Sequence, residues 1–342
     1  MRKKGTFIFL TALLVLAIAI SPLCAEGKQE SGKDSIKIAV LVKSLGNGFF
    51  EAVNDGAVEA SGELGDNVEI IYQGPSTPTA EGQIEIIETL IAQKVDGIAI
   101  SANDKDALVP VTKKAMKAGI KVISFDSGVA EPGRALHLAP SDTELIGQSQ
   151  VKLISDLMGG EGQFAVLSAS SQATNQNAWI EVMQEEVQKP KYNDLELVSV
   201  VYGDDVSDKS YREAVGLIES YPDLGGIVCP TTVGIAATAK AVKDLGLKDE
   251  VEVTGLGLPS EMQLYVEEGI CDKMALWNPI DLGYTSTYIL YDMITNGTEV
   301  SEGTSFECGR MGEINVGEGT VAIMGEPFEF TKENIAKYAK FF

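Results

Sequence analysis

Polar and aromatic side chains follow several short apolar runs of this sequence, but none of these groups has the spacing of a known catalytic motif. The chain lacks a G-x-S-x-G elbow, a Walker A motif and a glycine-rich dinucleotide motif after its first apolar run. His137 is the only histidine, so a Ser-His-Asp triad has a single candidate base. No Cys/His spacing indicates a metal. The sequence predicts a binding protein, with no catalytic residues, cofactor or metal.

The first candidate binding segment follows the apolar run at 36–42. It contains Lys43, Asn47, Phe49 and Phe50. Two phenyl rings offer flat apolar faces to the C–H groups of a sugar, while the amide and the ammonium group hydrogen-bond hydroxyls. The alternative interpretation is that both rings belong to the core of the domain.

A carboxylate, Asp126, directly follows the apolar run at 121–125. Such a group can accept hydrogen bonds from two adjacent hydroxyls, and hydrogen bonds to a charged acceptor are strong. The alternative interpretation is a solvated turn residue.

Later segments add amides, hydroxyls and indoles. Asn175 and Gln176 open a helical pattern whose next turn carries Trp179, and helical spacing favours a core position for this indole. Trp277 lies where the chain is expected to pass between two domains, which favours a ligand contact. Pro230, Thr231 and Thr232 follow another apolar run.

The elements that must position these residues alternate along the chain. Strands are predicted at 36–42, 68–72, 97–101, 121–125, 164–168, 195–202, 226–229, 251–255 and 273–277. Their near-continuous apolar runs are typical of parallel sheets covered on both faces. Helices are predicted at 50–64, 80–94, 107–118, 142–158, 177–188, 208–221 and 233–245, and Gly65, Gly119 and Gly246 stand at expected left-handed caps.

This alternation predicts an α/β fold with doubly wound parallel sheets. The strands are too many for one such sheet, so we expect two lobes joined by a hinge, with crossings at 139–141 and at Asn278–Pro279. The first lobe would contain residues 36–139 and 278–308, and the second 140–277 and 309–342. Ligands of open α/β sheets bind at the carboxyl ends of the strands, where the candidate residues lie.

The first 23 residues have the pattern of a signal peptide: Arg2, Lys3 and Lys4 precede an uncharged apolar stretch at 7–20. Cys24 then resembles the acylated cysteine of a bacterial lipobox, although Leu23 is an unusual residue before it. The alternative is ordinary cleavage after Ala25. Residues 24–35 are polar and are expected to form a flexible tether.

The chain is strongly acidic. Loss of three basic residues with the leader would change the formal net charge from −23 to −26, which argues against binding to nucleic acid or to anionic lipid. Cys229, Cys271 and Cys308 are too few and too scattered for a disulfide framework, so they are expected to be buried thiols.

Taken in order, these segments resemble the periplasmic sugar-binding family typified by ribose-binding protein, over nearly the whole mature chain. The motifs KSLGNGFF, FDSG, TNQNAW, IVCPTT and ALWNPIDLGY are most similar to those of the subgroup of rhamnose-binding and autoinducer-2-binding receptors. The resemblance implies a type I periplasmic binding protein with a site between its lobes.

The resemblance also implies the ligand-binding positions. Those matching the autoinducer-2 receptors are Lys43, Asp126, Gln176 and Pro230, with Asn175 in place of an aspartate and Thr232 in place of an alanine. Asn47, Phe49 and Phe50 match the first loop of the ribose family, and Trp277 replaces a glutamine. Ser127 and Gly257 replace the ribose family's arginine and second aspartate, so ribose is expected to fit poorly.

These departures favour rhamnose or a related deoxyhexose, because an aromatic ring in place of an amide suits a methyl group. The expected protein is an exported, lipid-anchored, monomeric receptor that delivers its sugar to an ABC permease. The alternative is an autoinducer-2 receptor. An asparagine at position 175 would avoid a second carboxylate near Asp126, which favours a neutral sugar.

Overall fold

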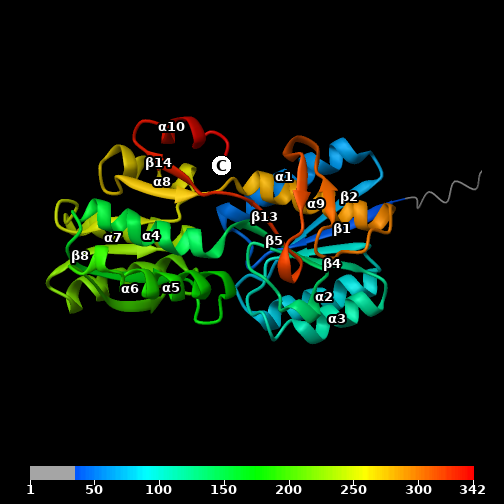
Figure 1. Cartoon of the computed structure of the whole chain (residues 1–342), viewed down its shortest axis with the longest axis horizontal. Coiled ribbons are helices and arrows are strands. Elements are labelled where there is room, and N and C mark those ends of the chain that lie inside the picture. Colours follow the sequence, from blue (N-terminus) through cyan, green and yellow to red (C-terminus); the bar gives the residue numbers. More distant parts are fainter. Residues whose placement is uncertain (1–34) are drawn as a thin grey trace, which may run out of the picture. The chain divides into compact units, whose positions relative to one another are not determined.

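The computed structural model of the chain describes residues 35–342, and the predicted leader, Cys24 and most of the predicted tether lie outside the described residues (Figure 1). Two parallel sheets organise the described part. The first is six-stranded, in the order β13-β5-β4-β3-β1-β2. Its strands are β1 (Ile36–Leu41), β2 (Val68–Gln73), β3 (Gly97–Ile100), β4 (Lys121–Phe125), β5 (Leu136–Ser141) and β13 (Val321–Gly325).

The second sheet is four-stranded, in the order β7-β6-β8-β9. Its strands are β6 (Gly162–Ser168), β7 (Leu195–Tyr202), β8 (Leu224–Cys229) and β9 (Glu252–Gly255). A parallel bridge from Leu256 to Ala275 continues it to β10 (Lys273–Leu276), which pairs antiparallel with β14 (Phe328–Thr331). A short hairpin of β11 (Ser305–Glu307) and β12 (Glu313–Asn315) forms a separate two-stranded sheet next to β13.

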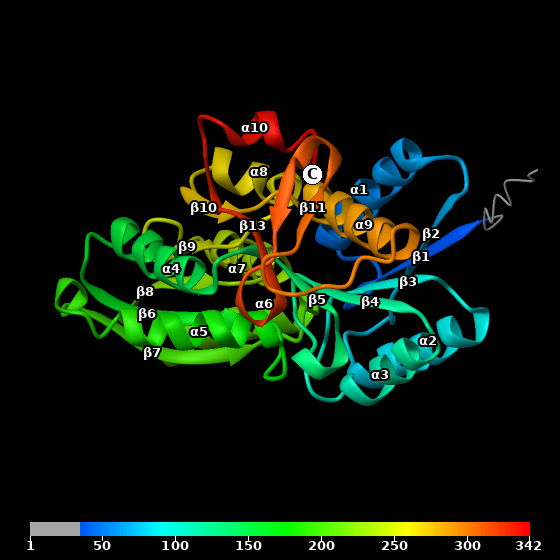
Figure 2. The same cartoon turned by 45° about the vertical axis from the view of Figure 1, so that its right-hand side comes forward.

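Helices cover both faces of the first sheet. α1 (Gly48–Leu64) and α9 (Pro279–Thr295) pack together on one face, and α2 (Ala80–Gln93) and α3 (Val109–Lys117) lie on the other (Figures 1 and 2). This double cover explains the full burial of strands such as β3, whose four residues are all buried.

The second sheet carries four further helices. α4 (Thr143–Leu157) packs on α5 (Thr174–Glu186), and α6 (Ser207–Ser220) packs on α7 (Thr232–Leu245). α8 (Pro259–Glu267) and the short α10 (Ile335–Tyr338) pack against each other. Within residues 35–342, no helix is both long and apolar enough to cross a bilayer.

The contact between α1 and α9 is close enough to involve the backbone. A Cβ atom at Gly56 would lie 1.8 Å from the carbonyl oxygen of Ile280, and one at Gly283 would lie 1.8 Å from that of Val53. Glycine at these two positions lets the helices meet without intervening side chains. The middle of α1 and the first turns of α9 are therefore in direct backbone contact.

The predicted α/β class and all nine predicted strands are confirmed, with small shifts at their ends. Five strands were missed: β5, β11, β12, β13 and β14. β5 has the sequence LHLAPS, in which a histidine and a proline interrupt the apolar run, and the others are short segments among glycines and charges. Of the three glycines expected at left-handed caps, Gly246 has the helical αL geometry, whereas Gly65 is extended with a positive φ of 134°.

The boundary predicted at 308/309 is wrong for one segment. Residues 309–342 were assigned to the second lobe, but β13 pairs with β5 in the first sheet, and only β14 returns to the strands of the second. The passage between sheets thus falls between Gly325 and Phe328. The short run VAIMG fits either sheet, so its pattern could not place it.

Cys229, Cys271 and Cys308 are buried free thiols, as predicted. Among the described residues, no cluster of histidine, cysteine and acidic side chains could hold a metal ion.

Candidate functional site

The ten side chains singled out in the sequence line one cavity between the two sheets. Its wall consists of Lys43, Asn47, Phe49, Phe50, Asp126, Asn175, Gln176, Pro230, Thr232 and Trp277, together with Trp179, Asp205, Thr231, Leu256 and Leu276. The empty volume, including the mouth, is about 370 Å³.

Parallel strands bring these residues to the same place. Asp126 directly follows β4, Pro230 directly follows β8, and Trp277 directly follows β10. Lys43 lies two residues beyond β1. The carboxyl ends of both sheets thus face one cavity, as expected for open α/β sheets.

A chain of hydrogen bonds joins the residues that follow the two sheets. Lys43 Nζ donates to Asn175 Oδ1 at 3.1 Å, and Asn175 Nδ2 donates to Asp126 Oδ1 at 2.9 Å. The backbone N–H of Gln176 also donates to Asn175 Oδ1, at 2.9 Å. Asn175 therefore uses both ends of its amide to connect a cation and a carboxylate of the first lobe to the second lobe.

A second layer of amides holds the first-lobe residues in place. Gln83 of α2 donates to the carbonyl groups of Val42 and Ser101, at 3.0 and 2.7 Å. Asn103 donates to the carbonyl of Lys43 at 2.9 Å. These buried hydrogen bonds connect the loop after β1 to the loop after β3. They hold the backbone of Lys43 in place and so position its side chain.

Asp126 is almost fully buried, which excludes the solvated-turn interpretation. It adopts a left-handed backbone conformation with φ 54°, uncommon for a residue other than glycine. Ser101 Oγ donates to its Oδ2 at 2.7 Å. Burial raises the pKa of Asp126, while the charge of Lys43 and the hydroxyl of Ser101 oppose the rise.

A second carboxylate of the cavity wall, the half-buried Asp205, was not among the predicted residues. It lies three residues after β7, has φ 50°, and accepts a hydrogen bond from Thr231 Oγ1. Burial raises its pKa as well, against the charge of Lys43. The same rule that identified Asp126, a carboxylate following a strand, could have identified Asp205. The expectation of a single carboxylate in the site is therefore wrong: two surround one lysine.

Aromatic rings form the other side of the cavity. Phe49 meets Phe50 edge-on at 5.2 Å between centroids and Trp277 at 6.3 Å, and Trp277 meets Trp179 at 5.7 Å. Trp179 is buried in the core, as predicted, and it also lines the cavity. A continuous aromatic surface thus connects α1 of the first lobe to α5 of the second.

Two polar atoms of the cavity wall are buried without a hydrogen-bond partner among the described residues: Trp277 Nε1 and Gln176 Oε1. One is a donor and the other an acceptor. Buried polar groups are usually satisfied, so an unpaired donor and acceptor on one cavity indicate that a ligand or water completes them.

His137 does not line this cavity. It lies in a neighbouring one, where its Nδ1 contacts Ser124 Oγ at 3.1 Å. Burial, together with the charge of Arg134, lowers the pKa of His137 to about 4, so the ring is neutral at physiological pH. The candidate site therefore combines one cation, two carboxylates, amides and aromatic rings without a histidine base.

Comparisons with known proteins all indicate the same family. Residues 38–299 match the periplasmic binding protein domain. The D-ribose/D-allose-binding protein of Pseudomonas aeruginosa is 27% identical over 257 residues, covering 72% of this chain and 78% of that protein. The ribose import binding protein of Escherichia coli is 24% identical and covers 75% and 83%.

Solved structures agree. An ABC transporter solute-binding protein of Clostridium phytofermentas, crystallised with L-rhamnose, has a TM-score of 0.86 and 38% identity, covering 90% of this chain and 99% of that one. A receptor of Clostridium saccharobutylicum in complex with autoinducer-2 has a TM-score of 0.84 at 23% identity, covering 89% and 99%, and so shares the fold. These relatives are binding proteins rather than enzymes. The chain therefore belongs to the periplasmic binding protein family, and the predicted resemblance to its ribose-binding-like, type I members is confirmed.

Proposed function

We propose that this chain is the solute-binding component of an ABC import system and that it binds a small neutral sugar, most closely rhamnose or a related deoxyhexose. The observation that carries the proposal is the composition of the cavity wall. One side consists of Lys43, Asn175 and the two carboxylates, which can hydrogen-bond hydroxyls, and the other of aromatic rings that meet edge to face.

The apolar side favours a deoxy sugar. Trp277 and Phe49 meet edge to face there, and Leu256 and Leu276 line the same cavity. A methyl group in place of a hydroxymethyl group gains apolar contact and leaves no unpaired hydroxyl. The 38% identical protein of Clostridium phytofermentas was crystallised with L-rhamnose, which supports the same ligand class.

The alternative function is an autoinducer-2 receptor. Lys43, Asp126, Gln176 and Pro230 keep the residue types of those receptors, and all four line the cavity. The substituted position is Asn175, which donates to Asp126 where an aspartate would repel it. The hydrogen bond from Asn175 to Asp126 therefore favours a neutral sugar over autoinducer-2.

The proposed transport cycle follows from the position of the cavity. A ligand held by residues of both sheets stabilises a closed arrangement of the lobes, and the closed, monomeric receptor then docks on the permease.

Calorimetric titration tests the ligand. The chain without its first 23 residues is titrated with L-rhamnose, L-fucose, D-ribose and autoinducer-2. We expect the tightest binding for a deoxyhexose, and a matching rise in melting temperature by mass action. Tight binding of autoinducer-2 with no response to any deoxyhexose would favour the alternative, and no response to any of the four would refute the sugar proposal.

We also propose that Cys24 carries the lipid anchor. Metabolic labelling with an alkynyl palmitate should tag the full chain, and Cys24→Ser should remove the tag and release the protein from membranes. Cys308→Ser is the matched control, since that thiol is buried in the fold. A wild-type chain that takes no label and fractionates as soluble protein would contradict the proposal.

A further inference from the structure

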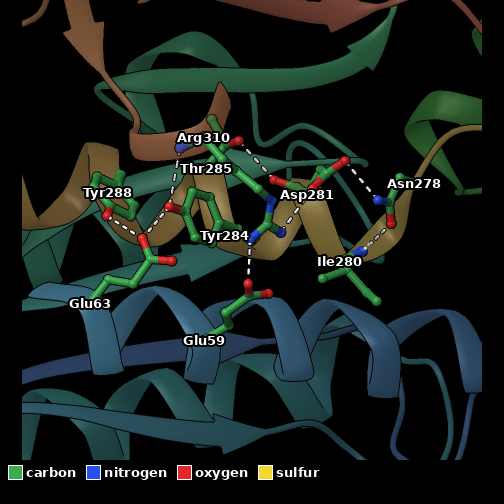
Figure 3. A network of polar contacts seen from close by, with 9 residues as sticks. All are labelled: Glu59, Glu63, Asn278, Ile280, Asp281, Tyr284, Thr285, Tyr288 and Arg310. Atoms are coloured by element: carbon green, nitrogen blue, oxygen red, sulfur yellow. Dashed lines mark hydrogen bonds and ion pairs between the residues drawn. The ribbon is translucent and has the colours of Figure 1, made fainter. Parts of the chain in front are cut away.

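Arg310 connects three segments of the first lobe (Figure 3). It lies in the turn η3 (Gly309–Met311) between β11 and β12. Its Nη1 donates to Glu59 of α1 at 2.6 Å, and its Nε and Nη2 donate to Asp281 of α9 at 3.0 and 2.8 Å. The guanidinium also lies 3.9 Å from the ring centroid of Tyr284. One side chain thus joins the hairpin to the two helices that meet at Gly56 and Gly283.

Asp281 carries this connection to the crossing between the lobes. Its Oδ1 accepts from Arg310, and its Oδ2 accepts from Asn278 Nδ2 at 2.6 Å. Asn278 Oδ1 in turn accepts from the backbone N–H of Ile280 at 3.0 Å and caps α9. Asn278 immediately follows Trp277, so this cap holds the backbone from which the indole reaches the cavity.

The turn that carries Arg310 is itself fixed. The hydroxyl of Tyr284 accepts from the backbone N–H of Arg310 at 3.3 Å and donates to Glu63. Gly309 has φ 49°, and a Cβ atom there would lie 2.1 Å from the same hydroxyl. The guanidinium is therefore presented to Asp281 from a constrained backbone.

We infer that Arg310 is a positioning residue of the ligand site: through Asp281 and Asn278 it fixes the orientation of Trp277 and so tightens ligand binding. The inference rests on the proposed sugar-binding function. An isolated exposed ion pair contributes little, but Arg310 makes charged hydrogen bonds to two helices and a stacking contact, and such networks hold geometry better than single pairs.

The test compares Arg310→Met, which keeps length and ring packing, with Arg212→Met. Arg212 is exposed on α6, and its guanidinium makes no hydrogen bond or ion pair with the described residues. For Arg310→Met we expect sugar affinity to fall roughly tenfold, a typical effect of contacts that act on a site at a distance. Amide exchange of residues 280–282 should accelerate in the ligand-free chain. Arg212→Met should change neither.

A second pair of variants tests the route. In an Asp281→Ala background, Arg310→Met should weaken binding less than twofold further, because the connection is already broken. Additive losses would refute the route through Asp281. Arg310→Lys cannot hydrogen-bond both helices and also stack on Tyr284, so it should give an intermediate loss of sugar affinity. If Arg310→Met does not fold, affinity and amide exchange are measured on Arg310→Lys instead.

The two readouts separate the inference from the proposed function. Faster exchange with unchanged affinity would make Arg310 a merely structural residue and overturn the inference. Unchanged exchange at 280–282 would also overturn it. If the wild type binds no sugar, the proposed function fails, while the exchange data still decide whether Arg310 orders the crossing.

Discussion

Replacing Asp126 by alanine is expected to weaken sugar binding by at least about thirtyfold while the protein remains folded. Truncating one partner of a buried, charged hydrogen-bond set costs on the order of 2–5 kcal/mol in binding. The change removes the carboxylate that accepts hydrogen bonds from Ser101 and Asn175 and that we expect to accept hydrogen bonds from the sugar. Calorimetric titration of both proteins with the best sugar measures the loss.

The folded state should tolerate this change because a carboxylate remains for Lys43. Asp205 lines the same cavity, and the attraction of Lys43 acts on it as well. Removing Asp126 leaves one cation facing one anion, and it abolishes the repulsion between the two carboxylates. The relief of this repulsion offsets the loss of the two hydrogen bonds, so we expect a melting temperature close to that of the wild type without ligand.

The matched control is Asp223→Ala, at an exposed position between α6 and β8. It removes the same charge from the net total without touching the cavity, so affinity should stay within twofold. Equal affinities of wild type and Asp126→Ala would show that the ligand does not use this carboxylate.

Local patterns predicted Asp126 and the nine main strands because the relevant signal lies within a few residues. A buried parallel strand is an apolar run, and the residue that follows it lies at the binding edge. β5 and β13 escaped because that local signal is weak in them: a histidine and a proline interrupt the apolar run of β5, and β13 is a short run beside glycines.

Asp205 shows a different limit of sequence reasoning. Asp204 and Asp205 are adjacent carboxylates after β7, and both have positive φ values, 54° and 50°. Asp204 turns outward to an ion pair with Lys209 at 2.6 Å, whereas Asp205 turns into the cavity. The residue type is identical at the two positions and the φ angles are nearly equal, so only the partners that the fold brings to each side chain distinguish them.

Contacts between the lobes could not be predicted from local sequence patterns either. The bond from Lys43 to Asn175 joins residues 132 positions apart in the sequence. The resemblance to known receptors named both residues as ligand contacts, but it gave no indication that they bond each other. Asn175 is therefore the side chain through which the second lobe hydrogen-bonds the charged groups of the first, Lys43 and Asp126.

Asn175→Asp is expected to weaken deoxyhexose binding by about a hundredfold or more at neutral pH. Its present Nδ2 lies 2.9 Å from Asp126 Oδ1, so an ionised aspartate would bring two carboxylate oxygens together. Like charges this close cost several kcal/mol. Asp205 already competes for Lys43, and a third carboxylate would leave the single cation facing three anions.

The pH dependence distinguishes repulsion from loss of shape. Crowding raises the pKa of the new carboxyl group in the closed state, and its protonated form again donates a hydrogen bond to Asp126. Binding by Asn175→Asp should therefore recover as the pH falls from 7 towards 5, whereas Asn175→Ala, which has no titrating group, should stay weak across this range. Titration calorimetry of the wild type and both variants, with the sugar and with autoinducer-2, measures these affinities. A pH-independent loss in Asn175→Asp would refute the charge argument. Tight binding of autoinducer-2 by the wild type, with no binding of the sugar, would make autoinducer-2 the ligand of this cavity.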